Sequence, residues 1–218
     1  IPDANVDVVI TDPPYLGNVM YSELSDFFYA WLRLGLKDIY TQFAPLSVDR
    51  AEEAIKNEEQ GKDADFYQNI LAAVFRECHR VLKDEGLLVF TFHHGAAEAW
   101  DALAQALVSA DFVIVSLWPV YAEMDVGVPV LGKQAVKFDS ILVCRKRRAQ
   151  AGPVVQDAVG LAAQINSEVA PFIEVLEKHF SLTAADKTSL FLAVATKLFT
   201  QRQINMLPSA IISARASM

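Results

Sequence analysis

The chain has 218 residues, 53% of them hydrophobic, and a formal net charge of −8 from 19 basic and 27 acidic side chains. This length and apolar content are enough for one sizeable core with an appendage. No apolar run approaches the roughly 20 residues that cross a bilayer, so we expect no membrane contact, and the acidic balance is not that of a free-standing nucleic-acid-binding protein.

The chain begins at Ile1 rather than Met, and we expect it to be a piece of a longer polypeptide. It has no charged and apolar leader, which favours a soluble, cytoplasmic protein. Its two cysteines, Cys78 and Cys144, lie among apolar neighbours. They predict reduced core residues rather than a disulfide, and no metal-ligand spacing is present.

The first predicted element is a strand over 6–11 that ends in a stiff turn. Its apolar run is typical of a strand buried on both faces. The sequence Asp12-Pro13-Pro14-Tyr15 follows directly. Each proline fixes φ and lacks a backbone N–H, and each pushes the residue before it towards extended geometry. We therefore expect the strand to end at Asp12, with carbonyl groups free to face a ligand.

This turn suits the recognition of an exocyclic amine. The Asp12 carboxylate can accept one amine proton and the carbonyl of Asp12 or Pro13 the other, which leaves the nitrogen lone pair directed at an electrophile. Tyr15 offers a flat face for stacking, which is worth about 1–3 kcal/mol per base. A base within a duplex would first have to flip out. The alternative is an ordinary proline-rich turn in which Tyr15 only packs; we favour amine binding.

A long insertion over 16–64 follows the turn. Asn18 and Tyr21 lie closest to the turn in the sequence, and we expect both to contact the substrate. An aromatic and apolar stripe, whose members are Phe27, Phe28, Trp31 and Leu32, is expected to pack on the sheet. The heavily charged segment 49–62 predicts a solvated helix and loop.

Helical and strand patterns then alternate, as in an α/β sheet. The predicted elements are a helix over 65–82, an exit turn over 83–86, a strand over 86–92, a helix over 96–109, and strands over 112–118 and 138–145. His93 and His94 follow the second strand at its carboxyl end. Either could contact the substrate, or they could form the entry turn of the next helix.

Helices alone are predicted from residue 152 to the end. The first is expected over 158–180 with a break at Pro171. Thr183 and Asp186 resemble a capping box that starts the next helix. The basic run 145–148, which follows the last strand, could contact phosphates, but we favour a solvated exit.

The segment Thr11–Arg33 (TDPPYLGNVMYSELSDFFYAWLR) resembles the catalytic segment of the large adenine-specific DNA methylases. Arg80–Val89 and Ser140–Arg145 fit the strands that follow in that family. The resemblance covers about residues 1–148. It implies an α/β fold: the second half of a Rossmann-like class I methyltransferase sheet with an antiparallel final strand, followed by a helical C-terminal extension over 152–218.

The resemblance also implies a function, the methylation of adenine N6 in DNA with S-adenosyl-L-methionine as donor. Asp12, Pro13, Pro14 and Tyr15 would be the catalytic residues, and Asp12 would lie near the methyl end of the donor. The glycine-rich donor motif of that family is absent from the sequence. We therefore expect an upstream part of the same protein, or a partner chain, to supply the donor site, and this chain alone to be inactive.

Two alternatives remain open. One is methylation of another amine, on an RNA base or a protein glutamine, although the latter usually has Asn at the position of Asp12. The other is a non-catalytic module that binds nucleic acid or another subunit.

Overall fold

The computed structural model of this chain describes residues 1–122, 136–148, 158–202 and 206–215. Its elements are β1 (Val6–Thr11), α1 (Tyr21–Leu36), two 3-10 turns η1 (Thr41–Phe43) and η2 (Glu58–Gln60), α2 (Ala64–Val81), β2 (Leu82–Phe92), α3 (Ala97–Ser109), β3 (Phe112–Tyr121), β4 (Phe138–Lys146), α4 (Ala158–Glu177), α5 (Ala184–Gln201) and α6 (Pro208–Arg215). No helix in these ranges is long and apolar enough to cross a membrane.

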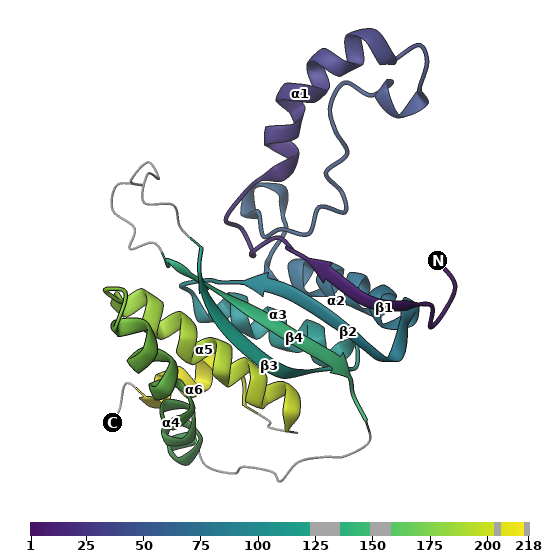
Figure 1. The fold of residues 1–218 in the computed structure, drawn as a ribbon. Helices are drawn as coiled ribbons and strands as arrows, with labels where there is room; N and C mark the ends of the chain where they lie inside the picture. Colours follow the sequence, from purple (N-terminus) through teal and green to yellow (C-terminus); the bar gives the residue numbers. More distant parts are fainter. Residues whose placement is uncertain (123–135, 149–157, 203–205, 216–218) are drawn as a thin grey trace.

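The fold is α/β, with a mixed four-stranded sheet in the order β1-β2-β4-β3 (Figure 1). β1 and β2 run parallel, with Thr11 opposite Phe90, and β4 is antiparallel to both of its neighbours. The predicted strands and the antiparallel final strand are therefore confirmed. Because β1 and β2 are parallel, Asp12 and His93 both follow the carboxyl ends of their strands, at the same end of the sheet. The basic run 145–148 lies at the opposite end of the sheet, because β4 is antiparallel to β2 and Cys144 pairs with Leu88, near the start of the β1–β2 pairing.

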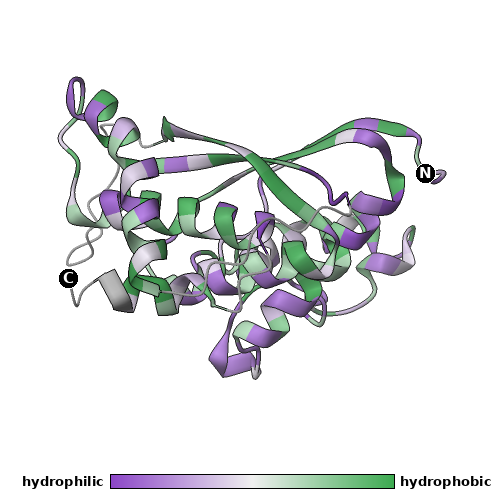
Figure 2. Cartoon of the chain, turned by 90° about the horizontal axis from the view of Figure 1, so that it is seen from below, coloured by the Kyte–Doolittle hydropathy of each residue, from purple (hydrophilic) through white to green (hydrophobic). Residues whose placement is uncertain are grey.

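Helices α2, α3 and α5 cover one face of the sheet (Figure 2). The residues that point into this core include Leu88, Phe90, Phe112 and Leu142, all at most 1% exposed. Their neighbours along each strand point to the other face, because side chains alternate across a strand. The apolar residues on that second face pair with one another across neighbouring strands, and they are Val8, Ile10, Leu87, Val89, Trp118, Ile141 and Val143. We call this set the open sheet face.

The open sheet face shows that the prediction for β1 was wrong in one respect. The strand forms as expected, but it is not buried on both faces, since Val8 is 45% and Ile10 79% exposed. β1 is also an edge strand of the sheet that the described residues form. Among those residues, nothing pairs with its outer edge.

The prediction of an exit turn at 83–86 was also wrong. Helix α2 passes directly into β2, because its C-cap Leu82 is already extended. The ladder with β1 jumps from the pair Val6 and Leu82 to the pair Val8 and Leu87, so residues 83–86 bulge out within the strand. Gly86 allows this bulge, since a Cβ there would lie 2.9 Å from the Leu82 side chain and from the Lys83 carbonyl oxygen.

The C-terminal helices pack on the body through α5, which contacts β3 and α3, and through α6, which contacts α3. The capping box of Thr183 and Asp186 is confirmed. Helix α4 runs through Pro171 without the predicted break. Pro171 cannot donate to the carbonyl of Ser167 four residues earlier, but both residues are exposed, so water can satisfy that carbonyl. The proposed start of the extension at 152 lies outside the described residues.

The insertion over 16–64 forms an arm that projects from the body (Figure 1). Its helix α1 buries only Ser22. The stripe that was expected to pack on the sheet is instead in solvent, with Phe27, Phe28, Trp31 and Leu32 between 52% and 68% exposed. That prediction was wrong. The charged segment 49–62 contains the short η2 turn rather than the predicted helix.

Candidate active site

The turn that follows β1 is fixed from below by helix α2. The buried hydroxyl of Tyr67 donates to the Pro14 carbonyl at 2.7 Å, and burial raises the pKa of that hydroxyl above its usual value. The Asn18 N–H donates to the Tyr15 carbonyl at 3.1 Å. In the described part of the chain, no group donates to the Pro13 carbonyl. Pro13 is itself buried, so its carbonyl is an acceptor without a donor at the base of the turn rather than an exposed one.

Asp12 is exposed, but one of its oxygens is held by two hydroxyl groups. The Tyr15 hydroxyl lies 2.6 Å from Asp12 Oδ1, and Thr91 Oγ1 donates to the same oxygen at 2.6 Å. The two hydroxyl oxygens are themselves 2.7 Å apart. Among the described residues no donor reaches Oδ2, so this oxygen is open to a ligand.

Tyr15 is packed against the end of β2. Its ring meets Phe92 and His93 edge to face, with centroids 5.1 and 4.9 Å away. Burial, together with the hydrogen bond to the Asp12 carboxylate, raises the pKa of the Tyr15 hydroxyl above its usual value. The hydroxyl thus stays protonated and can donate to Asp12 Oδ1 or to Thr91 Oγ1 over the whole physiological pH range.

The two histidines have different surroundings. His93 Nδ1 contacts the carboxylate of Asp139, which lies on β4. This pairing holds the His93 ring against Tyr15. His94 forms the entry to α3, because its Nδ1 accepts from the Ala96 N–H at 3.0 Å and its carbonyl accepts from Trp100 Nε1 at 2.9 Å.

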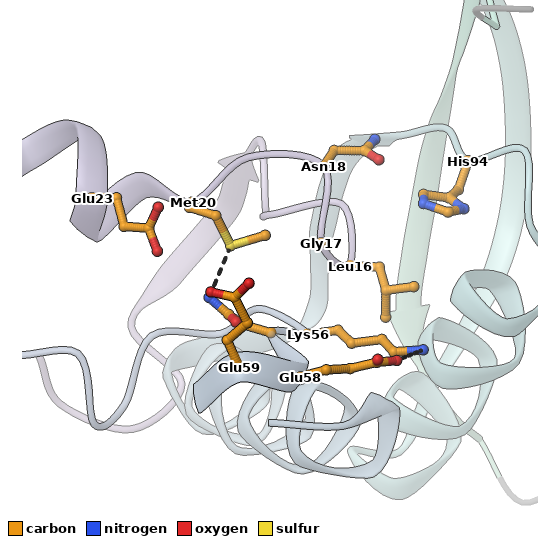
Figure 3. Close-up of a pocket in the computed structure, with 10 residues that line it drawn as sticks. Leu16, Gly17, Asn18, Met20, Glu23, Lys56, Glu58, Glu59 and His94 are labelled. Carbon is orange, nitrogen blue, oxygen red and sulfur yellow. Dashed lines mark hydrogen bonds and ion pairs between the residues drawn. The ribbon is translucent and has the colours of Figure 1, made fainter. Parts of the chain in front are cut away.

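A cavity of about 650 Å³ lies between the turn and the η2 loop (Figure 3). His94 and Asn18 lie on its sheet side and Glu23 and Met20 on its arm side. The remaining lining residues are Leu16, Gly17, Lys56, Asn57, Glu58 and Glu59. The cavity therefore adjoins the Asp-Pro-Pro-Tyr turn, and it is polar on most sides.

The floor of the cavity is tied to the turn by backbone contacts. The Lys56 N–H donates to the Leu16 carbonyl at 3.0 Å, and a Cβ on Gly17 would lie only 2.7 Å from the Lys56 carbonyl oxygen. Lys56 Nζ pairs with Glu98 on α3 at 2.9 Å, and this hydrogen bond raises the Lys56 pKa. The arm is thus anchored to the body at this point.

A family model described as DNA methylase matches residues 6–181. The chain belongs to this DNA methylase family. Two crystal structures of a proposed DNA modification methylase from Thermus thermophilus, one of them a selenomethionine derivative, also match, with 16% and 17% identity. They overlap 100% of this chain and 88% and 87% of the other chain, with TM-scores of 0.34 and 0.35. A comparison of this sequence with curated proteins found no match.

The structure of the methylase brings most of the predicted site residues together. The turn 12–15 lies against His93, while Asn18 and His94 line the cavity beside it. Tyr21 does not line this cavity and is 46% exposed. In the described part of the chain, no group of three or more metal-ligating side chains lies together.

Sequence reasoning missed Thr91, Asp139 and Lys56. Thr91 could have been found, since it precedes His93 by two residues, and His93 directly follows the strand that carries Thr91, so the two are expected on the same face. Asp139 and Lys56 carry no such signal, because they come from segments whose distance to the turn depends on the register of β4 and on the path of the arm.

The basic run 145–148 is engaged within the fold. Arg145 and Arg148 pair with Glu85, and Lys146 lies 3.7 Å from Asp84. Arg147 donates to the Thr200 carbonyl at 2.8 Å. These contacts lie at the end of the sheet opposite the Asp-Pro-Pro-Tyr turn, and they agree with the interpretation of the run as an exit from the strand.

Proposed function

We propose that this chain is the target-binding part of an S-adenosyl-L-methionine-dependent DNA adenine-N6 methyltransferase. The observation that carries the proposal is a pair of acceptors at the turn for which the described residues supply no donor, Asp12 Oδ2 and the carbonyl of the buried Pro13, in a chain of the DNA methylase family. Two acceptors on one rigid turn match the two protons of an exocyclic amine. Adenine is favoured over cytosine by the resemblance of Thr11–Arg33 alone.

In this proposal the residues of the turn orient the amine. Asp12 Oδ2 and the Pro13 carbonyl each accept one N–H, and Tyr15 stacks on the flipped base. The donor, when bound, supplies an electrophilic methyl group on a sulfonium. The amine nitrogen would form a bond to this methyl carbon as the carbon–sulfur bond breaks to leave a thioether, and the methylated nitrogen would lose one proton to solvent, so no cysteine nucleophile is needed. Cys144 is unsuited to that role, because it is fully buried and burial raises its thiol pKa.

We assign the remaining substrate contacts to the rim of the turn. Asn18 and His94 lie on the wall of the cavity, where the base and its flanking nucleotides would enter. His93 supports Tyr15 from the side. Tyr21 would contact DNA farther from the base, since it lies outside the cavity.

The donor site is proposed to lie in another part of the same protein or in a partner chain. The described residues fit only the reacting end of the donor, because the sequence has no glycine-rich turn of the kind that binds a nucleotide at the end of a first strand. The unpaired edge of β1 and the open sheet face give a place for that part. Pairing there would extend the sheet into a Rossmann-like class I methyltransferase sheet.

The test uses the protein that carries this chain together with its donor-binding part. We expect calorimetry to show binding of S-adenosyl-L-methionine and a labelled methyl group to be transferred to adenine-containing DNA. Asp12→Ala should abolish transfer while the thermal melt is retained. Asp7→Ala, which removes a carboxylate at the start of the same strand, should leave transfer intact.

Each alternative has its own outcome. An assembled protein that binds no donor is a non-catalytic module. A protein that binds the donor but methylates RNA or a protein amide, and not DNA, has a different amine as its substrate. Transfer that persists in Asp12→Ala would refute the role given to this carboxylate.

A further inference from the structure

Thr91 is placed where it can control the Asp12 carboxylate. It lies on β2 one residue beyond Phe90, the partner of Thr11, and its Oγ1 is 2.6 Å from Asp12 Oδ1. Tyr15, the other donor to Asp12, belongs to the same turn and moves with it. Among the described residues, Thr91 is the one donor that joins the Asp12 side chain to the sheet.

The protons of this cluster can be counted. Each hydroxyl carries one proton. Thr91 donates to Asp12 Oδ1, and Tyr15 donates either to the same oxygen or to Thr91 Oγ1, which lies 2.7 Å away. Both arrangements occupy Oδ1 and leave Oδ2 without a donor. The side of the carboxylate that faces a ligand is thereby fixed.

We propose that Thr91 is a positioning residue, which holds the Asp12 carboxylate so that Oδ2 faces the target amine. This proposal rests on the proposed function of Asp12. Without the Thr91 hydroxyl, Tyr15 can donate to either oxygen, and the exposed Asp12 side chain can rotate about its own bonds. The amine would still bind, but its lone pair would be directed less well at the electrophile.

A threonine is well suited to this position. Its hydroxyl supplies the donor, and its branched Cβ restricts χ1, so the donor has few orientations. His93, two residues farther along the chain and directly after β2, holds the Tyr15 ring from the side and is itself held by Asp139. The end of β2 therefore supports both polar residues of the turn, Asp12 through Thr91 and Tyr15 through His93.

The experiment compares Thr91→Val with Thr91→Ser in the protein that contains the donor-binding part. Valine keeps the shape of threonine and removes the donor, whereas serine keeps the donor. We expect Thr91→Val to lower kcat by about 10- to 100-fold, the usual effect of a misplaced reacting group, with little change in KM for DNA. Thr91→Ser should restore most of kcat. Thr188→Val on α5, a matched change far from the turn, should leave kcat unchanged.

The inference is overturned if Thr91→Val keeps the wild-type kcat, or if the valine and serine variants lose activity equally. Crystal structures of both variants add a readout that does not depend on transfer. We expect the Asp12 carboxylate to turn in Thr91→Val and to stay in place in Thr91→Ser; an unmoved carboxylate in the valine variant refutes the inference. If the wild-type protein transfers no methyl group and the Asp12 carboxylate still turns in Thr91→Val, the proposed function is refuted and the positioning role of Thr91 stands.

Discussion

Replacing Tyr67 by Phe removes one hydroxyl from beneath the Asp-Pro-Pro-Tyr turn. The hydroxyl donates to the Pro14 carbonyl at 2.7 Å, and the ring that carries it is 0% exposed. Phenylalanine keeps the ring, so no cavity opens. The change therefore removes the hydrogen bonding of this hydroxyl to the turn and leaves the packing of the ring in place.

The size of the effect follows from the surroundings of the two groups. A typical hydrogen bond contributes about 0.5–1.5 kcal/mol net, and leaving a buried acceptor without a partner costs about 1–3 kcal/mol. Pro14 is only half-buried, so water can partly replace the hydroxyl. We expect a loss of about 1–2 kcal/mol, which for a chain of this size lowers Tm by about 2–8 °C.

Thermal melts of Tyr67→Phe and Tyr40→Phe, followed by circular dichroism, measure this loss. Tyr40 is 54% exposed, and a surface change of this kind usually shifts stability by less than about 0.5 kcal/mol. A Tyr67→Phe melt no lower than that of Tyr40→Phe would show that the turn does not depend on α2. The anchoring described for the site would then be wrong.

Two further predictions concern the same chain. Burial raises the Tyr67 pKa above its usual value of 10.0, so above about pH 10 the unfolded chain loses a proton that the folded chain keeps, and the free energy of unfolding falls as the pH rises. Urea titrations at several pH values should show a shallower fall for Tyr67→Phe than for the wild type. An equal fall in the two proteins would contradict this. Trp31→Ala should change stability by less than about 0.5 kcal/mol, since the side chain is 68% exposed. Trp100→Ala, which removes a side chain that is 0% exposed, should lower the free energy of unfolding by about 3–5 kcal/mol. A loss of stability of that size in Trp31→Ala would mean that the arm packs on the body.

The local rules of the chain were enough for most of the fold and for the centre of the site. Proline geometry predicted where β1 ends, and the alternation of strands and helices predicted an α/β sheet. Once β1 and β2 are parallel, the carboxyl ends of the two strands must meet, which is why His93 lies against Tyr15.

What could not be predicted depends on contacts between distant segments. An apolar stripe such as Phe27 to Leu32 shows that a helix has an apolar face, but not whether this chain covers it. Pro171 was expected to break a helix, yet α4 continues through it, because Ser167 and Pro171 are exposed and water can satisfy the carbonyl that lacks a donor. Asp139 gave no signal of its own, because an aspartate near the start of a strand is ordinary until its neighbour across the sheet is known.

The unpaired edge of β1 has a practical consequence for work with this chain. An exposed strand edge offers free backbone N–H and C=O groups to any other strand, and natural proteins protect such edges from aggregation with charged side chains. In β1 that protection rests on Asp7, the single charge in the strand, and even this residue is paired with Lys83 at 2.7 Å. Expressed on its own, the chain should be prone to self-association through this edge, which size-exclusion chromatography at increasing protein concentration would detect.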